Sequence, residues 1–416
     1  MSPPPPLLLP LPRGNWTYDW ARFPAAWFGT NWTGWETEEQ MQKFGKYTLF
    51  MLGWQAMQGP SNYSHTLRAQ FEQVQRVKER YPHMPCVLYV PSDGASPLFD
   101  AMLPLFEDFQ RYKNFFYLNA SGEPYKIRYK CAINTTHSGS STGVKAKGCE
   151  VLDWNFYNTS ARDYYLDVVL KRIAEMDSSN QVFDGIFFDA AMGFMRTASC
   201  PAAAANCRAG GYTQAETDAI GIEILRRTVT NLAKWGQGKV PIFNAHYADM
   251  SFNNDTIHSE SAILDAITES GGAMMRYYDG DGPLSIALID NALEERLRQI
   301  PTVFHVKGKK QKTIDAVAVF LLIRQKFSYF MESTGYYDRN FEWHAAYDLD
   351  YGLPLSAGPS REVNTATGTV EYSRTYTRCV VAISCNVSRC QEKGADLIHN
   401  CCSASIVNTS TGRIVV

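Results

Sequence analysis

The sequence predicts an α/β protein: a (β/α)8 TIM barrel followed by a small C-terminal antiparallel β-domain. From Ala25 to about Glu332, short apolar runs alternate with longer amphipathic runs, which is the pattern of successive βα units. Eight such units within about 310 residues match the count and length of a TIM barrel that carries insertions. After Gly335 the pattern changes to short alternating strands separated by turn residues, which predicts a second unit.

The eight expected strands lie at residues 25–32, 48–57, 86–92, 150–158, 182–189, 240–247, 262–270 and 301–308. Within the expected strand at 182–189, residues 182–188 are apolar apart from Asp184 and Gly185, as expected for a strand that is buried on both faces in a parallel sheet covered by helices, and Asp189 ends it. Amphipathic helices are expected at 37–47, 65–81, 97–113, 160–176, 213–235, 285–300 and 312–332. A doubly wound open sheet is the alternative, although its usual glycine-rich phosphate loop is absent.

The chain divides into three predicted regions. Residues 1–20 form a proline-rich disordered tail, residues 21–334 the TIM-barrel catalytic domain, and residues 335–416 the C-terminal β-domain. Residues 118–148, rich in Gly, Ser, Thr and Lys, read as an inserted loop.

Charge and composition exclude several classes of partner. A net charge of -2, from 40 Lys and Arg against 42 Asp and Glu, gives no attraction to nucleic acid or to an anionic membrane. No stretch approaches the 18 to 20 apolar residues of a membrane span. The sequence lacks a Walker loop, G-x-G-x-x-G and H-E-x-x-H, so no cofactor and no metal are expected. A neutral substrate fits this balance.

Cysteines and glycosylation signals favour a secreted or lumenal protein. Ten cysteines occur without a C-x-x-C pair, which favours disulfides over zinc; Cys131 with Cys149, and Cys200 with Cys207, flank expected loops. Nine N-x-[ST] sequons predict a glycoprotein. The N-terminal stretch MSPPPPLLLPLPRG lacks the basic region of a secretory signal peptide, so no signal peptide is evident.

Candidate site residues follow from the barrel, because reactive groups of TIM barrels stand at the carboxyl ends of the strands. Carboxylates that converge there, beside aromatic rings, are what glycosidic bond cleavage requires: one protonates the leaving oxygen, and another attacks the anomeric carbon or activates water. Asp189 and Glu269 are the predicted catalytic pair. The residues predicted to line the sugar site are Asp153, Trp154, Asn244, His246, Trp32 and Trp54.

Each candidate also has a structural interpretation. Asp189 could cap a helix, and Glu269 could be a plain loop acid. For Trp32 and Trp54, core packing is the main alternative to a sugar platform. His246 and His305 are more often hydrogen-bonded core residues than ligands. Asp184, at the start of its strand, reads as a structural acid at the amino end of the barrel.

Several motifs resemble a known family. The segments VLDWNFYNTSARDYY, FDGIFFDAA, ITESG and YDLDYGLPLSAGP, followed by VEYSRTYTRCVVAISCNVS, resemble the hypothetical glycoside hydrolase family 15 and, more distantly, the family 114 endo-α-1,4-polygalactosaminidases. The likeness spans residues 20 to 390 or so, and its most particular part is D-x-G-x-P followed by Y-x-R. It implies a catalytic Asp that falls on Asp189 and a Glu that falls on Glu269. The Asn that usually follows the Asp is Ala190 here.

The predicted function is hydrolysis of O-glycosidic bonds in a polysaccharide or glycan by a two-carboxylate mechanism. A carbohydrate-binding barrel without catalysis is the alternative that the Ala190 departure supports. A purely structural extracellular glycoprotein is a third interpretation, which an absence of any open pocket at the strand ends would favour.

Overall fold

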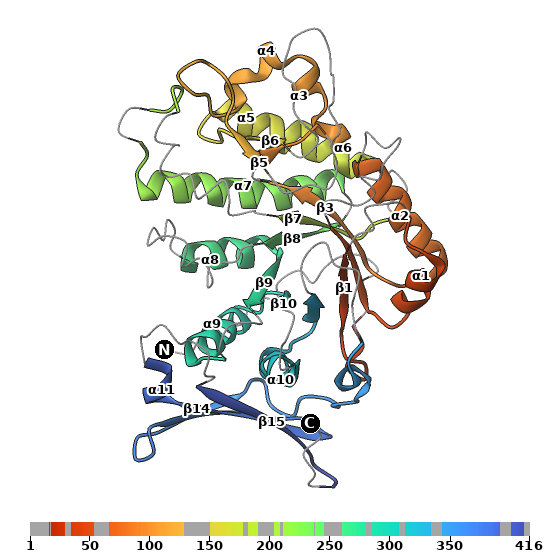
Figure 1. The fold of residues 1–416 in the computed structure, drawn as a ribbon, viewed down its shortest axis with the longest axis vertical. Helices are drawn as coiled ribbons and strands as arrows, with labels where there is room; N and C mark the ends of the chain where they lie inside the picture. Colours follow the sequence, from red (N-terminus) through yellow and green to blue (C-terminus); the bar gives the residue numbers. More distant parts are fainter. Residues whose placement is uncertain are drawn as a thin grey trace.

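A closed barrel of eight parallel strands forms the centre of the molecule (Figure 1). In barrel order the strands are β1 (Ala26–Gly29), β2 (Leu49–Leu52), β3 (Cys86–Pro91), β7 (Gly185–Asp189), β8 (Val240–Asn244), β9 (Ala273–Asp279), β10 (Thr302–Lys307) and β11 (Tyr329–Ser333). The ring closes just before β1, where the Phe330 amide donates to the Pro24 carbonyl at 2.8 Å and Ala25 pairs in parallel with Phe330. The predicted TIM barrel is confirmed.

This computed structural model describes residues 16, 18–29, 35–53, 66–92, 94–97, 99–128, 150–177, 182–189, 204–208, 211–236, 238–244, 260–279, 284–307, 313–333, 343–391 and 401–411. Within these ranges, none of the helices combines the length and the apolar character needed to cross a bilayer.

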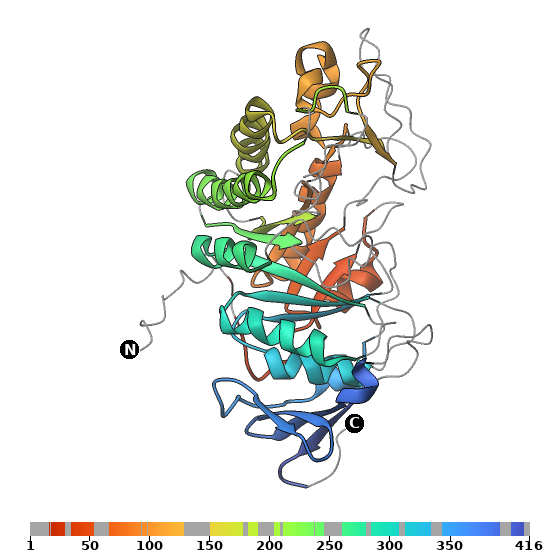
Figure 2. The ribbon, with the colours of Figure 1, turned by 90° about the vertical axis from the view of Figure 1, so that its left-hand side faces the viewer.

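Helices cover the outside of the barrel (Figures 1 and 2). They are α1 (Glu38–Phe44), α2 (Thr66–Arg80), α7 (Gln214–Trp235), α8 (Glu260–Ser270), α9 (Ile286–Leu297) and α10 (Thr313–Ile323). Capping boxes start two of them: the side chains of Thr37 and Thr213 each accept from the amide of the third helical residue, whose own side chain accepts from the cap amide. The first residues of each of these two helices therefore mark where the helix begins.

A long insertion separates β3 from β7 and lies at one end of the molecule's long axis (Figure 1). It contains the short helices α3 (Pro104–Glu107), α4 (Phe109–Tyr112), α5 (Thr159–Asp163) and α6 (Leu170–Glu175), with a π-helical segment at Tyr164–Val169. It also contains a three-stranded antiparallel sheet of β4 (Gly94–Ala95), β6 (Glu150–Asp153) and β5 (Lys126–Arg128). Residues 150–158 were expected to supply the fourth barrel strand. That expectation is wrong, because β6 pairs antiparallel with both of its neighbours outside the barrel.

Two further element assignments from sequence are corrected. Residues 262–270, expected to contain a strand, belong to helix α8, in which Leu264 and Ile267 are buried at helical spacing, and the strand β9 follows it. The helix expected at 312–332 ends at Ile323, and β11 begins at Tyr329 after a turn in which Phe327 adopts a φ of 64°. Both stretches mix apolar and polar residues in a way that fits a helix or a strand, so hydropathy alone did not distinguish the two periods.

The C-terminal region forms a four-stranded antiparallel sheet, as predicted. Its strands are β12 (Ser360–Asn364), β13 (Thr369–Thr375), β14 (Cys379–Asn386) and β15 (Cys402–Asn408), and the short helix α11 (Val387–Gln391) follows β14 in the chain. The sheet packs on α10, which explains why every residue from Asp315 to Ile323 in that helix is buried. It thereby covers a face of the barrel at the end opposite the insertion (Figure 1).

The two motifs that are most particular to the family resemblance fasten this sheet to the barrel. Arg374, of Y-x-R, donates to the carbonyls of Leu321, Leu322 and Arg324 at 2.5–3.0 Å, at the carboxyl end of α10. In D-x-G-x-P, Gly352 has a φ of +79°, and a Cβ there would lie 2.0 Å from Thr377 Oγ1. Both motifs therefore have structural roles.

Disulfides join the end of the sheet. Cys385 bonds Cys402, and Cys390 bonds Cys401. Cys207 is also disulfide-bonded, whereas Cys131, Cys149 and Cys200 lie outside the described residues. Cys86 and Cys379 are buried free thiols, and burial raises the pKa of both.

Asp184 lies at the amino end of the barrel, as the sequence predicted. Its carboxylate is 2.7 Å from Lys78 Nζ and accepts from the Cys86 amide at 2.8 Å, so it connects α2 to the starts of β3 and β7. Both side chains of this ion pair are about nine-tenths buried.

Candidate active site

Inward-facing rings cross the barrel one layer below its carboxyl rim. Phe28 of β1 contacts Phe187 of β7 at a centroid distance of 5.6 Å and His305 of β10 at 6.1 Å, with edge-on geometry in both cases. His305 is fully buried among these rings. Because successive inward residues are two apart along a strand, the next inward layer lies at the rim.

Asp189 occupies that rim layer at the end of β7, two residues beyond Phe187. Its Oδ2 accepts a hydrogen bond of 2.5 Å from the Tyr89 hydroxyl, and its Oδ1 accepts one of 2.5 Å from Asn244 Nδ2. Tyr89 comes from β3 and Asn244 ends β8, the two strands that flank β7. Three adjacent strands therefore fix one carboxylate.

A glutamine from α2 contributes to the barrel wall beside Tyr89. Strands β2 and β3 pair at only two positions, Phe50 with Cys86 and Met51 with Val87. Further along β3, the Tyr89 amide donates instead to Oε1 of Gln70, from α2, at 3.0 Å. The buried side chain of Gln70 thus accepts the backbone hydrogen bond of Tyr89 that β2 does not accept. This contact holds Tyr89 in position to donate to Asp189.

A second acid ends a barrel strand at the same level. Asp279 is in register with Lys307 of β10, and both lie two residues beyond the pair Tyr277 and His305. Since His305 and Phe187 meet the same ring of Phe28, the backbone positions of Asp279 and Asp189 both belong to the layer above it. Asp279 was missed from sequence because the seventh strand was expected within residues 262–270, before β9 begins at Ala273.

The inserted sheet brings Asp153 toward the rim, whereas Trp154 packs in the core of the insertion. Asp153 is in register with Gly94, which follows β3 by three residues. Trp154 is 1% exposed and stacks on Phe156 at 5.5 Å, so its ring presents no face to a sugar. The interpretation of Trp154 as a substrate platform finds no support in this packing.

Glu269 does not join this site. It lies near the end of α8 and forms an ion pair with Arg226 of α7, on the outer, helical surface of the barrel. More than half of each side chain is exposed, at 56% for Glu269 and 54% for Arg226. The expectation that Glu269 ends a strand is wrong, and the reason is that TESG closes a helix before β9 begins.

The remaining predicted residues, His246, Trp32 and Trp54, lie outside the described residues. The candidate site therefore combines Asp189 and Asn244, which the sequence predicted, with Tyr89 and the strand position of Asp279, which it did not. Strand alternation in CVLYVPS, with Val87 and Tyr89 on the inward side, was the available signal for Tyr89.

Solved structures that resemble the chain share little sequence with it. Amy13B of Eubacterium rectale is 9% identical, with coverage of 89% of this chain and 87% of that one and a TM-score of 0.45. An α-amylase from H. orenii is 11% identical, with coverage of 89% and 90% and a TM-score of 0.43. A morphinone reductase mutant bound to tetrahydroNAD is 10% identical, with coverage of 75% and 82% and a TM-score of 0.42. No curated protein sequence matches the chain.

Protein families give a more specific result. Residues 136–380, more than half of the chain, match one family, and the matched segment includes β7 with Asp189, β8 with Asn244, β9 with Asp279 and the Y-x-R clamp of Arg374. The resemblance seen in the sequence is thereby confirmed. The chain belongs to hypothetical glycosyl hydrolase family 15.

Proposed function

We propose that the protein hydrolyses O-glycosidic bonds of a polysaccharide or glycan with Asp189 and Asp279 as its two carboxylates. The observation that carries the proposal is the fixed carboxylate of Asp189 at the rim, held by Tyr89 and Asn244 from both neighbouring strands. A barrel rim with two acids on different strands is the arrangement that glycosidic cleavage needs.

The two acids take different roles in this mechanism. Asp189, whose two donors orient both oxygens, acts as the nucleophile or as the base that activates water at the anomeric carbon. Asp279 acts as the general acid that protonates the leaving glycosidic oxygen. The oxocarbenium-like charge that develops between them is stabilised by the carboxylate of Asp189.

A screen of labelled polysaccharides and aryl glycosides tests this function, with released reducing ends as the readout. On any substrate that is turned over, Asp279→Asn is expected to lower kcat by about 10²-fold or more, because a positioned general acid contributes about 10²–10⁴. The comparison variant is Asp153→Asn, at the acid that the inserted sheet brings toward the rim, which is expected to raise KM with a smaller effect on kcat. A loss of turnover in Asp153→Asn alone would move the general acid to the inserted sheet.

We further propose that the protein is a secreted or lumenal glycoprotein, which the disulfides at Cys385–Cys402 and Cys390–Cys401 support. Among the described sequons, the Asn158 side chain donates to the Asn114 carbonyl at 2.9 Å and caps α5. At Asn408, by contrast, the hydrogen bonds from Ser410 and Thr411 all go to Oδ1.

Expression in a secreting eukaryotic host, followed by deglycosylation and peptide mapping, is expected to find glycan on Asn408 and little or none on Asn158, because a glycan must displace the Asn114 contact. Full occupancy of Asn158 would contradict this expectation, and unmodified protein retained in the cytosol would contradict the proposed location.

A further inference from the structure

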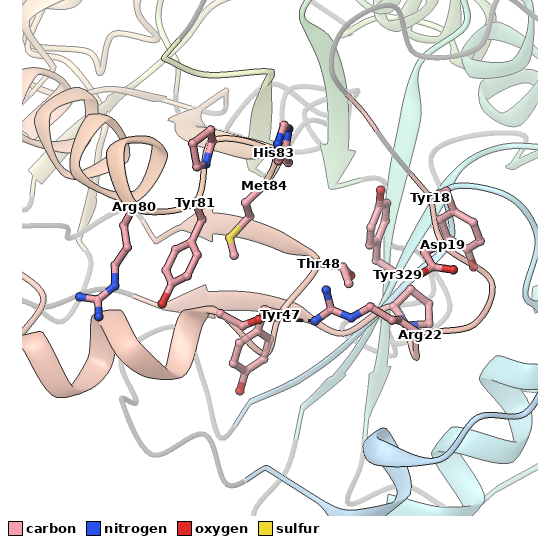
Figure 3. Close-up of a pocket in the computed structure, with 13 residues that line it drawn as sticks. Tyr18, Asp19, Arg22, Tyr47, Thr48, Arg80, Tyr81, His83, Met84 and Tyr329 are labelled. Carbon is pink, nitrogen blue, oxygen red and sulfur yellow. Dashed lines mark hydrogen bonds between the residues drawn. The ribbon is translucent and has the colours of Figure 1, made fainter.

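We propose that the amino end of the barrel carries a second carbohydrate-binding site, separate from the catalytic rim. The structure has a cavity of about 430 Å³ there, within the range of small-molecule pockets, which is roughly 300–1,000 Å³ (Figure 3). Its lining comes from the residues that precede β1, β2 and β3 and from the first residue of β11. The rim with Asp189 lies at the other end of the same strands.

Tyrosine rings and a mixed set of polar groups form the walls. The tyrosines are Tyr18, Tyr47, Tyr81 and Tyr329, and the polar side chains include Asp19, Arg22, Arg80 and His83 (Figure 3). A sugar ring offers an apolar C–H face to aromatic rings and a circle of hydroxyls that both donate and accept. An inorganic anion would not favour the carboxylate of Asp19, and an apolar ligand would desolvate the polar walls without forming hydrogen bonds to them.

Neighbouring groups already engage several of these side chains, which fixes the shape of the pocket. Arg22 donates to the carbonyls of Gly45 and Lys46 at 3.4 and 3.2 Å, the Tyr81 hydroxyl donates to the Met41 carbonyl at 2.7 Å, and Arg80 pairs with Glu38. The Tyr18 hydroxyl accepts from Arg324 Nε at 2.8 Å. The walls of the pocket are therefore preorganised for ligand binding.

Tyr329 differs from these residues. Its side chain is 99% buried, and its hydroxyl has no hydrogen-bond partner among the described residues. Burial also raises the pKa of this hydroxyl, so it stays protonated and can donate. A buried hydroxyl without a partner carries an unfavourable desolvation cost. Tyr329 lines the pocket, so a small movement of its ring would let a ligand hydroxyl reach this group and offset that cost.

The test is Tyr329→Phe, which removes only the hydroxyl. Saturation-transfer NMR with glucose, galactose, N-acetylgalactosamine and maltose finds the best probe, and calorimetry measures its Kd. The variant is expected to keep or raise Tm, to weaken binding about fivefold or more, and to leave turnover at the rim unchanged. Arg22→Ala, at the exposed wall, is expected to weaken the same binding.

Two matched variants distinguish sugar binding at this pocket from a purely structural role of Tyr329 and from sugar binding at the rim. Tyr376→Phe removes a buried hydroxyl that donates to the Leu321 carbonyl and does not line the pocket, and it is expected to lower Tm without changing the Kd. Asn244→Ala perturbs the rim alone. The inference fails if the Kd of Tyr329→Phe equals that of the wild type, if its Tm falls as in Tyr376→Phe, or if binding is lost only in Asn244→Ala. Because the readout is binding and not turnover, its failure leaves the proposed hydrolysis untouched.

Discussion

Asp189→Asn is expected to lower kcat by about 10²–10⁴-fold on whichever glycoside the protein cleaves, with little change in Tm. The substitution keeps the shape of the side chain but removes the negative charge and one of the two acceptor oxygens. The Tyr89 hydroxyl can reverse its direction and accept from the new amide, so the local packing survives. The measurement is initial rate against substrate concentration, with thermal unfolding recorded for each variant.

The sharpest control is Glu269→Gln. The family resemblance implies a catalytic Glu at this position, whereas the structure places Glu269 on the outer surface in an ion pair with Arg226. Wild-type kcat is therefore expected for Glu269→Gln, and a loss comparable to that of Asp189→Asn would overturn the assignment of the site to the rim.

Tyr89→Phe is expected to lower kcat by an intermediate amount. It leaves the charge on Asp189 and removes one of its two orienting donors, so a loss of roughly tenfold in kcat is expected, smaller than for Asp189→Asn. If Tyr89→Phe had no effect, the carboxylate would need no orientation from β3, and the catalytic interpretation of that hydrogen bond would fail.

The part of the site that sequence could predict is the part that depends on local pattern. Asp189 and Asn244 both end short apolar strands, and the position of each follows from strand length alone. The closed barrel followed from the count of eight units, although two of the eight strands were assigned to the wrong residues. One error replaced β9 by α8, and the other replaced β11 by β6, so the total remained correct.

The remaining features depend on contacts between distant segments. The sequence of β6 is typical of a strand whether that strand lies in the barrel or outside it. Only its antiparallel pairing with Gly94 and Ala95 excludes it from the barrel. Likewise, Tyr89 and Asp189 are 100 residues apart in the chain, and parallel register alone brings them together. The roles of Gly352 and Arg374 depend in the same way on the docking of the C-terminal sheet.

The amino end of the barrel holds a buried ion pair on which we expect the largest stability effect. Lys239 Nζ lies 2.9 Å from Asp177 Oδ2, with side-chain exposures of 1% and 0%. The same carboxylate oxygen accepts from the amides of Val182 and Phe183, and Lys239 also donates to the Phe183 carbonyl at 3.0 Å. The pair therefore fixes the chain that enters β7 against the chain that enters β8. Burial lowers the pKa of Lys239, and the bond from Asp177 opposes that shift.

Lys239→Met is expected to destabilise the fold by about 3–5 kcal/mol, because it removes the cation that lies 2.9 Å from the buried carboxylate of Asp177. Adding Asp177→Asn should recover about 1 kcal/mol or more, since a neutral amide still accepts from the two backbone donors without a buried charge. Urea unfolding of both variants measures these free energies. Arg226→Met supplies the matched exposed ion pair, and a cost below about 1 kcal/mol is expected there because solvent screens that pair. Equal costs for Lys239→Met and Arg226→Met would show that burial does not set the strength of this contact, and the account of how β7 is held beneath Asp189 would be wrong.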